Sequence, residues 1–183
     1  MLRVLVTRPE PGAARTARAL EAMGHRPLLL PLSEIRPLPA DARALPARID
    51  AVAATSANAL RLAAPQLLAR LGAFACHAVG AGTAQAARAA GFAHVEEGPG
   101  DAAALAAQIG GALAGKSLVY LCGRVRLSSF EERLGTAGVH VAAVETYDTV
   151  PIEPPSETVS ARLGGAGVDA VLLSSAKEGQ APR

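Results

Sequence analysis

The sequence predicts an α/β protein built from doubly wound parallel sheets that form two lobes. Short apolar segments of strand length alternate with Ala-rich segments of helical periodicity along nearly the whole chain of 183 residues. This alternation is typical of parallel sheets with helices on both faces. Proline-rich stretches at residues 31–46 and 151–155 separate an inner part of the chain from its two ends. They indicate two crossings between the lobes.

The first three elements form a strand–helix–strand unit. Val4–Val6 is a short apolar run suited to a buried strand. Residues 11–23 carry Ala and Leu at helical spacing, with Pro11 acceptable in the first turn and Gly24 as a stop signal. Residues 27–32 read as the second strand. This order of elements favours a right-handed, parallel crossover.

The inner part of the chain repeats the pattern of a strand, a small polar or glycine-containing turn and an Ala-rich helix. The expected strands are residues 51–54, 75–79, 92–96, 117–121 and 139–144. The expected helices are residues 59–71, 84–90, 101–113 and 129–136. These elements make a complete inner lobe, which we place at residues 37–147.

The outer lobe is discontinuous, because it takes residues 1–35 and 150–183. After the second crossing, a helix at 157–163 and a strand at 170–173 are expected, and the periodicity then stops. This lobe has about three strands, whereas a sheet averages about five or six. We therefore expect the first lobe to be incomplete.

Composition argues against a nucleic-acid partner. The net charge is only +2, from 18 basic and 16 acidic residues, and aromatic residues make up 3% of the chain with no Trp. Nucleic-acid binders usually carry a strongly basic face, and single-strand binders need aromatic stacking platforms. A few arginines in a cleft can still bind a small acidic ligand, because local potential matters more than net charge.

Cysteine usage and hydropathy indicate a reduced, cytoplasmic protein without membrane contact. Cys76 and Cys122 are far apart in sequence and are interpreted as small buried hydrophobes, not as a disulfide or a zinc site. The N-terminus has no signal-peptide apolar stretch, and no apolar run reaches the ~20 residues of a membrane span. We expect no metal.

Small polar or glycine-containing turns follow five of the expected strands. Ligands of open α/β sheets bind at the carboxyl ends of the strands, where helix N-termini attract anions. Several such turns around one cleft would suit a ligand with many carboxylates. The candidate binding residues in these turns are Arg8, Thr55, Ser56, Asn58, Gly80, Gly82, Thr83, Gly123, Arg124, Ser174 and Ser175.

Each turn also has a plain structural interpretation. Thr55 and Ser56 belong to residue types that commonly cap helices. Residues 80–83 look like a fragment of a dinucleotide-binding loop, but Gln85 stands where its third glycine belongs. The four histidines are scattered and are interpreted as structural. No Ser/His/Asp or metal-binding constellation is visible in the sequence.

Taken in order, these segments resemble the uroporphyrinogen-III synthase family. The resemblance rests on their order and spacing, since no single motif is specific, and it covers residues 1 to about 175. The segments that carry it are Val4–Pro9, Leu30–Ile35, Thr55–Leu60, Ala78–Ala84 with Ala90–Phe92, Leu121–Arg124 and Val144–Val150.

The resemblance implies two flavodoxin-like lobes joined by a two-stranded connector, with the substrate hydroxymethylbilane between them. It implies a lyase that closes this linear tetrapyrrole into uroporphyrinogen III, with inversion of ring D and loss of water. A monomer without a cofactor is expected. Tyr147 matches the tyrosine proposed in the family as the acid that assists departure of the hydroxyl group. Its structural alternative is a half-buried strand residue at the connector.

The resemblance also implies a longer chain. The family continues beyond the position of Ser174 and Ser175 and supplies another strand-end turn there. Either this chain is truncated or aberrant, or its numbering joins segments across a gap; a truncated form could be inactive. Two functional alternatives therefore accompany the enzyme: a non-catalytic sensor of tetrapyrroles or other anions on the same scaffold, and a nucleotide-binding module.

Overall fold

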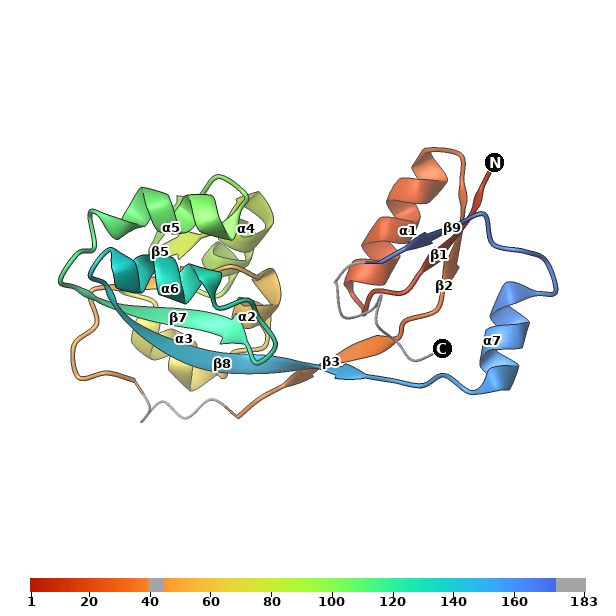
Figure 1. The fold of residues 1–183 in the computed structure, drawn as a ribbon. Coiled ribbons are helices and arrows are strands. Elements are labelled where there is room, and N and C mark those ends of the chain that lie inside the picture. Colours follow the sequence, from red (N-terminus) through yellow and green to blue (C-terminus); the bar gives the residue numbers. More distant parts are fainter. Residues whose placement is uncertain (40–44, 174–183) are drawn as a thin grey trace. The chain divides into compact units, whose positions relative to one another are not determined.

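A computed structural model describes residues 1–39 and 45–173 of the chain (Figure 1). The chain divides into two compact units, one formed by Met1–Ile35 with the residues from Thr149 onward, the other by Arg36–Asp148. Strands β3 (Ser33–Pro37) and β8 (His140–Pro151) each include residues of both units. The predicted α/β architecture with parallel sheets is confirmed.

The first unit holds a three-stranded parallel sheet in the order β2-β1-β9. Its elements are β1 (Arg3–Val6), α1 (Gly12–Ala22), β2 (Arg26–Leu29), α7 (Ser156–Leu163) and β9 (Ala170–Leu172). Val4 and Val6 of β1 and Ala13 and Ala17 of α1 are buried. Helix α7, in contrast, contains no buried residue. The expected strand–helix–strand unit is therefore present at the start of the chain.

The second unit contains the larger sheet, whose strands follow the order β3-β8-β7-β4-β5-β6. Its remaining strands are β4 (Ala51–Ala54), β5 (Ala75–Ala78), β6 (His94–Glu97) and β7 (Ser117–Gly123). Neighbours from β8 to β6 are parallel. Counted along the chain from β4, the five parallel strands have the order 3-2-1-4-5. This is the Rossmann order and differs from the flavodoxin order 2-1-3-4-5.

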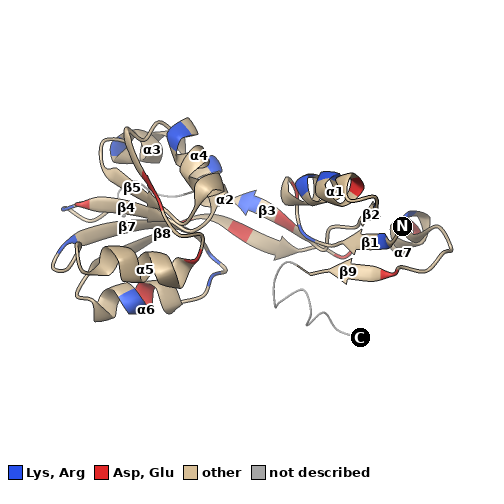
Figure 2. Ribbon diagram, turned by 90° about the horizontal axis from the view of Figure 1, so that it is seen from above, with Lys and Arg blue, Asp and Glu red and all other residues tan. Residues whose placement is uncertain are grey.

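Helices cover both faces of this sheet, as Figure 2 shows. Helices α2 (Ala57–Arg61), α3 (Pro65–Leu71) and α4 (Ala81–Ala89) lie on one face, and α5 (Ala102–Gly110) and α6 (Ser129–Thr136) lie on the other. Alternate residues of β4 enter the two buried clusters: Val52 and Ala54 one cluster, Ala51 and Ala53 the other. A strand buried on both faces must be apolar at every position, which explains its continuous apolar sequence.

The structure differs from the predicted elements around Pro65. The sequence predicts one helix over 59–71, but the chain forms α2 and α3 with a break between them. Ala64 is extended, with ψ 137°. A proline disfavours helical conformation in the preceding residue and removes a backbone donor, so Pro65 begins a new helix as its first residue.

The crossing segments also contain more strand than the residue pattern alone predicts. The sequence predicts a strand over 139–144 followed by a return crossing, whereas β8 continues to Pro151. Strand β3 lies within the first proline-rich stretch and forms an edge of its sheet. Proline is tolerated in edge strands because its missing N–H is not needed for pairing. No helix in the described part of the chain is long and apolar enough to span a membrane.

Candidate functional site

The strand order of the larger sheet reverses between β4 and β7. From β4 the chain proceeds to β5 and β6 on one side, and from β7 to β8 on the other. Open α/β sheets bind ligands at such a switch point, outside the carboxyl ends of the strands. The parallel strands bring nine predicted residues to this edge: Thr55, Ser56, Asn58, Gly80, Gly82, Thr83, Gly123, Arg124 and Tyr147. Arg8 belongs to the other unit, and Ser174 and Ser175 lie outside the described residues.

Thr55 stands at the end of β4 and is bound by a tyrosine that the sequence analysis did not select. The hydroxyl groups of Thr55 and Tyr120 are 2.6 Å apart. Tyr120 is 2% exposed, while Thr55 is half-buried. Leaving a buried hydroxyl without a partner costs about 1–3 kcal/mol. Tyr120 thus requires Thr55, and Thr55 is held in place from the buried side.

Ser56 has the capping role that its residue type predicts. It is the N-cap of α2, with extended backbone, and its Oγ accepts a hydrogen bond from the Asn58 amide at 3.2 Å. A serine side chain that accepts this bond keeps its own proton as a donor. Ser56 and Asn58 are both half-buried at the edge of the sheet, so capping does not remove them from the candidate site.

The turn after β5 is partly covered by the chain that follows β6. The Gly100 amide donates to the Val79 carbonyl at 2.6 Å, and a Cβ on Gly80 would lie 3.1 Å from the Cα of Gly100. Gly80 is therefore explained by close backbone packing without a ligand. Thr83 is 6% exposed, whereas Gly82 is exposed. Of the three predicted residues here, Gly82 is the one on the surface.

Tyr147 lies directly across Gly123. A Cβ built on Gly123 would be 2.6 Å from Cζ of Tyr147 and 2.9 Å from its hydroxyl oxygen. The register between β7 and β8 shifts at this point, so that Gly123 pairs with Tyr147, and the Arg124 amide donates to the Tyr147 carbonyl at 2.8 Å. A β-bulge of this kind redirects a side chain at the end of a strand. The bulge and the glycine together place the Tyr147 ring over the end of β7.

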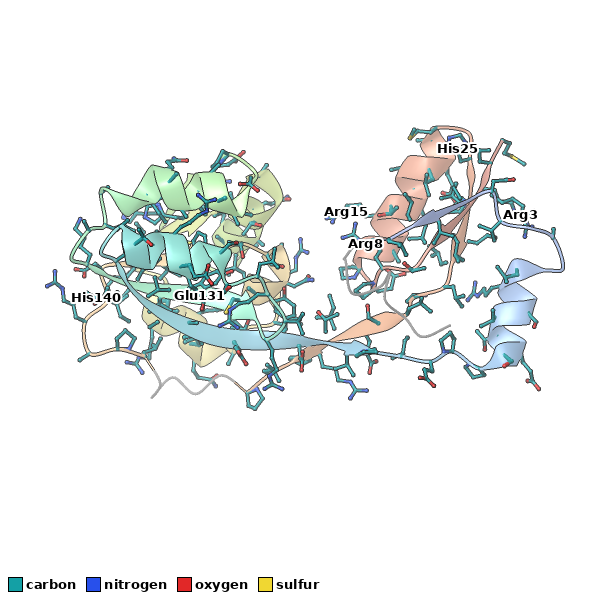
Figure 3. All side chains as sticks on the ribbon, viewed as in Figure 1. Arg3, Arg8, Arg15, His25, Glu131 and His140 are labelled. Atoms are coloured by element: carbon teal, nitrogen blue, oxygen red, sulfur yellow. The ribbon has the colours of Figure 1, made fainter. Side chains whose placement is uncertain are left out.

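Arg124, predicted to bind an anionic ligand, is paired with carboxylates of its own protein. Its Nε lies 3.1 Å from Glu145 and its Nη1 lies 3.2 Å from Asp148. Arg126 contacts Glu131 through two nitrogens and Glu145 through a third, each at 3.0 Å. We call these five side chains the β7-end network; Glu131, which belongs to α6, is labelled in Figure 3. Its two cations face three carboxylates, so its net charge is negative.

The β7-end network also fixes the loop after β7. Arg126 donates to the Gly123 carbonyl at 3.2 Å and is 23% exposed at its side chain. Hydrogen bonding to Glu131 raises the pKa of Arg126. Burial disfavours ionisation of Glu145, but hydrogen bonds from Arg126 and Arg124 outweigh it and lower the pKa of Glu145. A ligand carboxylate at Arg124 must therefore compete with Glu145 and Asp148.

Replacing Glu145 with Gln should make the stability of the second unit change less with pH in the acid range. The folded-state pKa of Glu145 is lowered from 4.5, so its stabilisation is present above pH 4.5 and is lost as pH falls through the lower, folded value. The variant should melt below the wild type at neutral pH by the equivalent of about 1 kcal/mol or less, because the side chain is 37% exposed. Melting temperatures across the acid range will show this difference shrink. Glu153→Gln, an exposed glutamate outside the network, is the control; a difference that persists in acid would contradict the assignment.

In the first unit, Arg8 folds back on the start of α1. A Cβ on Gly12 would lie 2.6 Å from Nε of Arg8, and Nη1 of Arg8 donates to Thr16 at 3.3 Å. Figure 3 shows Arg8 beside the lower end of this helix. Among the described residues, its buried Nε has no hydrogen-bond partner. The glycine that begins α1 therefore leaves room for the guanidinium.

Neither a search for metal-ligand clusters among the described residues nor the groove beside α2, α3 and α4 points to another site. Residues 1–39 and 45–173 hold no cluster of three or more potential metal ligands. A groove of about 840 Å³ lies between α2, α3 and α4, lined mostly by Ala and Leu with Arg61 and Gln85 as its polar side chains. It includes none of the predicted site residues. We place the candidate site at the strand ends, because polar groups from several strands converge there.

Three residues at this edge of the sheet were not predicted from the sequence as site residues: Tyr120, Arg126 and Glu145. Tyr120 reads as one apolar residue within a buried strand, and its partner Thr55 is 65 positions away. Arg126 follows the turn after β7 as a single arginine, which in a sequence is most simply interpreted as a solvated surface charge. The only local signal was the rarity of tyrosine, since the chain has two tyrosines and no tryptophan, and a buried tyrosine usually needs a hydrogen-bond partner.

Comparison with known proteins bears on both fold and family. Residues 14–180 match the sequence model of a family described as uroporphyrinogen-III synthase HemD. No curated protein matches the sequence significantly. Among solved structures, uroporphyrinogen-III synthetase from Helicobacter pylori is similar, with 20% identity and a TM-score of 0.60 over 88% of this chain and 68% of that one.

Two structures of uroporphyrinogen III synthase from Thermus thermophilus are also similar. A mutant form has 22% identity and a TM-score of 0.58, and the match covers 93% of this chain and 71% of that one. The wild-type form has 22% identity and a TM-score of 0.51 with the same coverage. At this level of identity, the similarity supports the fold.

Proposed function

Because this chain belongs to the uroporphyrinogen-III synthase family, we propose that it cyclises hydroxymethylbilane to uroporphyrinogen III. Members of this family are enzymes of tetrapyrrole biosynthesis. We propose that this chain is a hydro-lyase. The observation that carries the proposal is the match over residues 14–180. The candidate residues at the ends of β4, β5 and β7, with Tyr147 of β8 beside the end of β7, are consistent with it.

The proposed reaction exchanges one carbon–oxygen bond for a new carbon–carbon bond. The terminal hydroxymethyl group loses its oxygen as water, driven by the pyrrole nitrogen, and leaves an azafulvene. The substituted carbon of ring D attacks this centre to form a spiro intermediate, which fragments and recloses with ring D inverted. The final loss of a proton from ring D balances the proton that leaves with the hydroxyl group. Neither a redox step nor a cofactor is needed.

In this proposal the protein contributes mainly by positioning the substrate. Holding reacting groups in the correct geometry can supply several kcal/mol of the barrier. The hydroxyl groups of Thr55 and Ser56 and the first turn of α2 would bind carboxylates of the substrate. Tyr147 would donate a hydrogen bond to the departing hydroxyl group as general acid. We expect a monomer that takes hydroxymethylbilane as a small-molecule substrate.

A coupled assay tests the proposed function directly. Porphobilinogen deaminase generates hydroxymethylbilane, which closes without inversion to the type I isomer when no synthase acts on it. We expect the purified chain to divert the product to the type III isomer, as measured by chromatography of the oxidised porphyrins. Accumulation of type I isomer alone, from a chain that melts cooperatively, would reject the activity.

A second candidate function is a non-catalytic sensor of tetrapyrroles or other anions on the same scaffold. The pairing of Arg124 with Glu145 and Asp148 weakens anion binding at this position for the enzyme and the sensor alike, so it does not decide between them. A sensor should show a ligand-dependent rise in melting temperature with uroporphyrin and no turnover of hydroxymethylbilane. The same two measurements therefore separate the two candidates.

A further inference from the structure

We infer that Tyr120 is a positioning residue that turns the hydroxyl proton of Thr55 toward a carboxylate of the bound tetrapyrrole. The inference rests on the proposed function, because that function supplies the polycarboxylate ligand. It adds a buried residue of β7 to a site that the sequence placed only in the turns.

The direction of the hydrogen bond follows from the burial of Tyr120. The residue is 2% exposed, and within residues 1–39 and 45–173 its hydroxyl group contacts one polar partner, Oγ1 of Thr55 at 2.6 Å. A phenol has a single proton to donate. Burial raises the pKa of Tyr120 to about 12, so the phenol keeps that proton near neutral pH. The buried proton is satisfied when Tyr120 donates and Thr55 accepts.

A threonine that accepts from Tyr120 retains its own proton for a ligand. Thr55 is half-buried at the carboxyl end of β4, beside the switch point of the sheet. Its hydroxyl can then donate to a carboxylate oxygen from the solvent side. In the opposite arrangement Thr55 would present only lone pairs, which repel a carboxylate. The phenol therefore determines whether Thr55 attracts or repels an anion.

The phenol is rigid enough to impose this direction. The ring of Tyr120 packs against Phe130 of α6, with centroids 4.7 Å apart and planes at 46°. Tyr120 also pairs with Ala53 in the register of β4 and β7, so both hydroxyl groups are attached to adjacent strands. A site residue held by a packed and hydrogen-bonded neighbour keeps its geometry without reorganisation.

Raman spectroscopy tests the direction of the bond without any need for activity. The chain has only two tyrosines, so Tyr147→Phe leaves Tyr120 as the sole source of the tyrosine Fermi doublet. The intensity ratio of that doublet distinguishes a phenol that donates from one that accepts. In Tyr147→Phe we expect the intensity ratio that is typical of a phenol that donates a hydrogen bond. This ratio should be lost in the Tyr147→Phe/Thr55→Val variant. An acceptor ratio would overturn the inference.

Kinetics test the consequence for the ligand. Tyr120→Phe should raise KM for hydroxymethylbilane about fivefold and change kcat by less than about twofold, since one hydrogen bond to the ligand is weakened. Thr55→Val should raise KM by about tenfold, and Thr55→Ser should restore it. The double variant Tyr120→Phe/Thr55→Val should match Thr55→Val alone, because Tyr120 acts through Thr55. An unchanged KM in Tyr120→Phe would overturn the inference.

A matched control separates positioning from loss of stability. Ile109→Val removes one buried methylene from α5 in the same core cluster and should lower the melting temperature to a similar extent. Its KM should equal that of the wild type. An equal rise of KM in Ile109→Val and Tyr120→Phe would assign Tyr120 a structural role only.

Failure of the inference can be told apart from failure of the proposed function. If the wild type produces only the type I isomer, the proposed function fails. The affinity of each variant for uroporphyrin, measured by the fluorescence of uroporphyrin, is then compared in place of KM. Weaker uroporphyrin binding by Tyr120→Phe then supports the inference, and unchanged binding overturns it. If the wild type is active but Tyr120 gives the acceptor ratio, the function stands and the inference falls.

Discussion

Replacing Tyr147 with Phe should lower kcat about a hundredfold, which is the lower end of the usual contribution of a general acid. The hydroxyl group of the substrate leaves more slowly when it receives no proton or hydrogen bond. The Phe ring still covers Gly123, so the fold should be unaffected. Initial rates in the coupled assay, with melting temperature as the test of folding, measure the effect.

The matched control for Tyr147→Phe is Tyr120→Phe, which removes the same atom from the other tyrosine of the chain. It should change KM and leave kcat nearly unaltered. If Tyr147→Phe and wild type turn over at the same rate, Tyr147 is only a half-buried strand residue. A parallel loss of kcat and melting temperature would likewise remove the acid role and indicate a structural one.

Replacing Gly123 with Ala should reduce turnover about as much as loss of the Tyr147 hydroxyl. The new Cβ would lie 2.6 Å from Cζ of Tyr147, which is too close for two non-bonded carbon atoms, so the ring must leave its position over β7. Overpacking of this kind costs about 1–3 kcal/mol. We therefore expect both a lower melting temperature and a large loss of kcat, measured by thermal unfolding and by the coupled assay.

Two further variants show whether the effect passes through Tyr147. In a Tyr147→Ala background, Gly123→Ala should cost little additional stability, because the clashing ring is gone. Gly135→Ala is the matched control: it adds the same methyl group within α6, where nothing lies within 4 Å, and should be neutral or stabilising. A Gly123→Ala variant with wild-type kcat would show that the placement of Tyr147 is unimportant for turnover.

Most elements of the fold could be predicted from the sequence because their signals are local. The helix of residues 11–23 and the strand at Val4–Val6 follow from periodicity and from Pro11 and Gly24. The apolar run at 51–54 marks a strand buried on both faces. The break at Pro65 was also a local signal, and the single helix over 59–71 was predicted wrongly because its Leu and Ala spacing outweighed the proline.

Strand order could not be predicted, because periodicity carries no information on which strands are neighbours. The alternation of strands and helices is equally compatible with the Rossmann order observed here and with the flavodoxin order. The switch point between β4 and β7 depends on that order. The family resemblance, in contrast, depended on the order of short segments along the chain, and the match over residues 14–180 confirms it.

The candidate site was predicted in part. The turns after β4, β5 and β7 do lie at one edge, as the rule for parallel sheets requires, and Tyr147 of β8 lies beside the end of β7, but the roles of these residues stay predictions. For Gly80 and Thr83 the structure shows backbone packing and burial. For Arg124 it shows two carboxylate partners, 21 and 24 residues away in sequence.

The sequence by itself determined the α/β class, the positions of most helices and strands, the turns that end the strands and the family. All of these follow from residues close together in the chain or from their order. Only the tertiary structure decided which charges and hydroxyl groups meet. Tyr120 reaches Thr55 across 65 residues, and Arg124 is neutralised by Glu145 and Asp148. Such pairs depend on strand register and on the bulge at Gly123, which bring distant residues within 3 Å or so of each other, the distance over which a hydrogen bond acts.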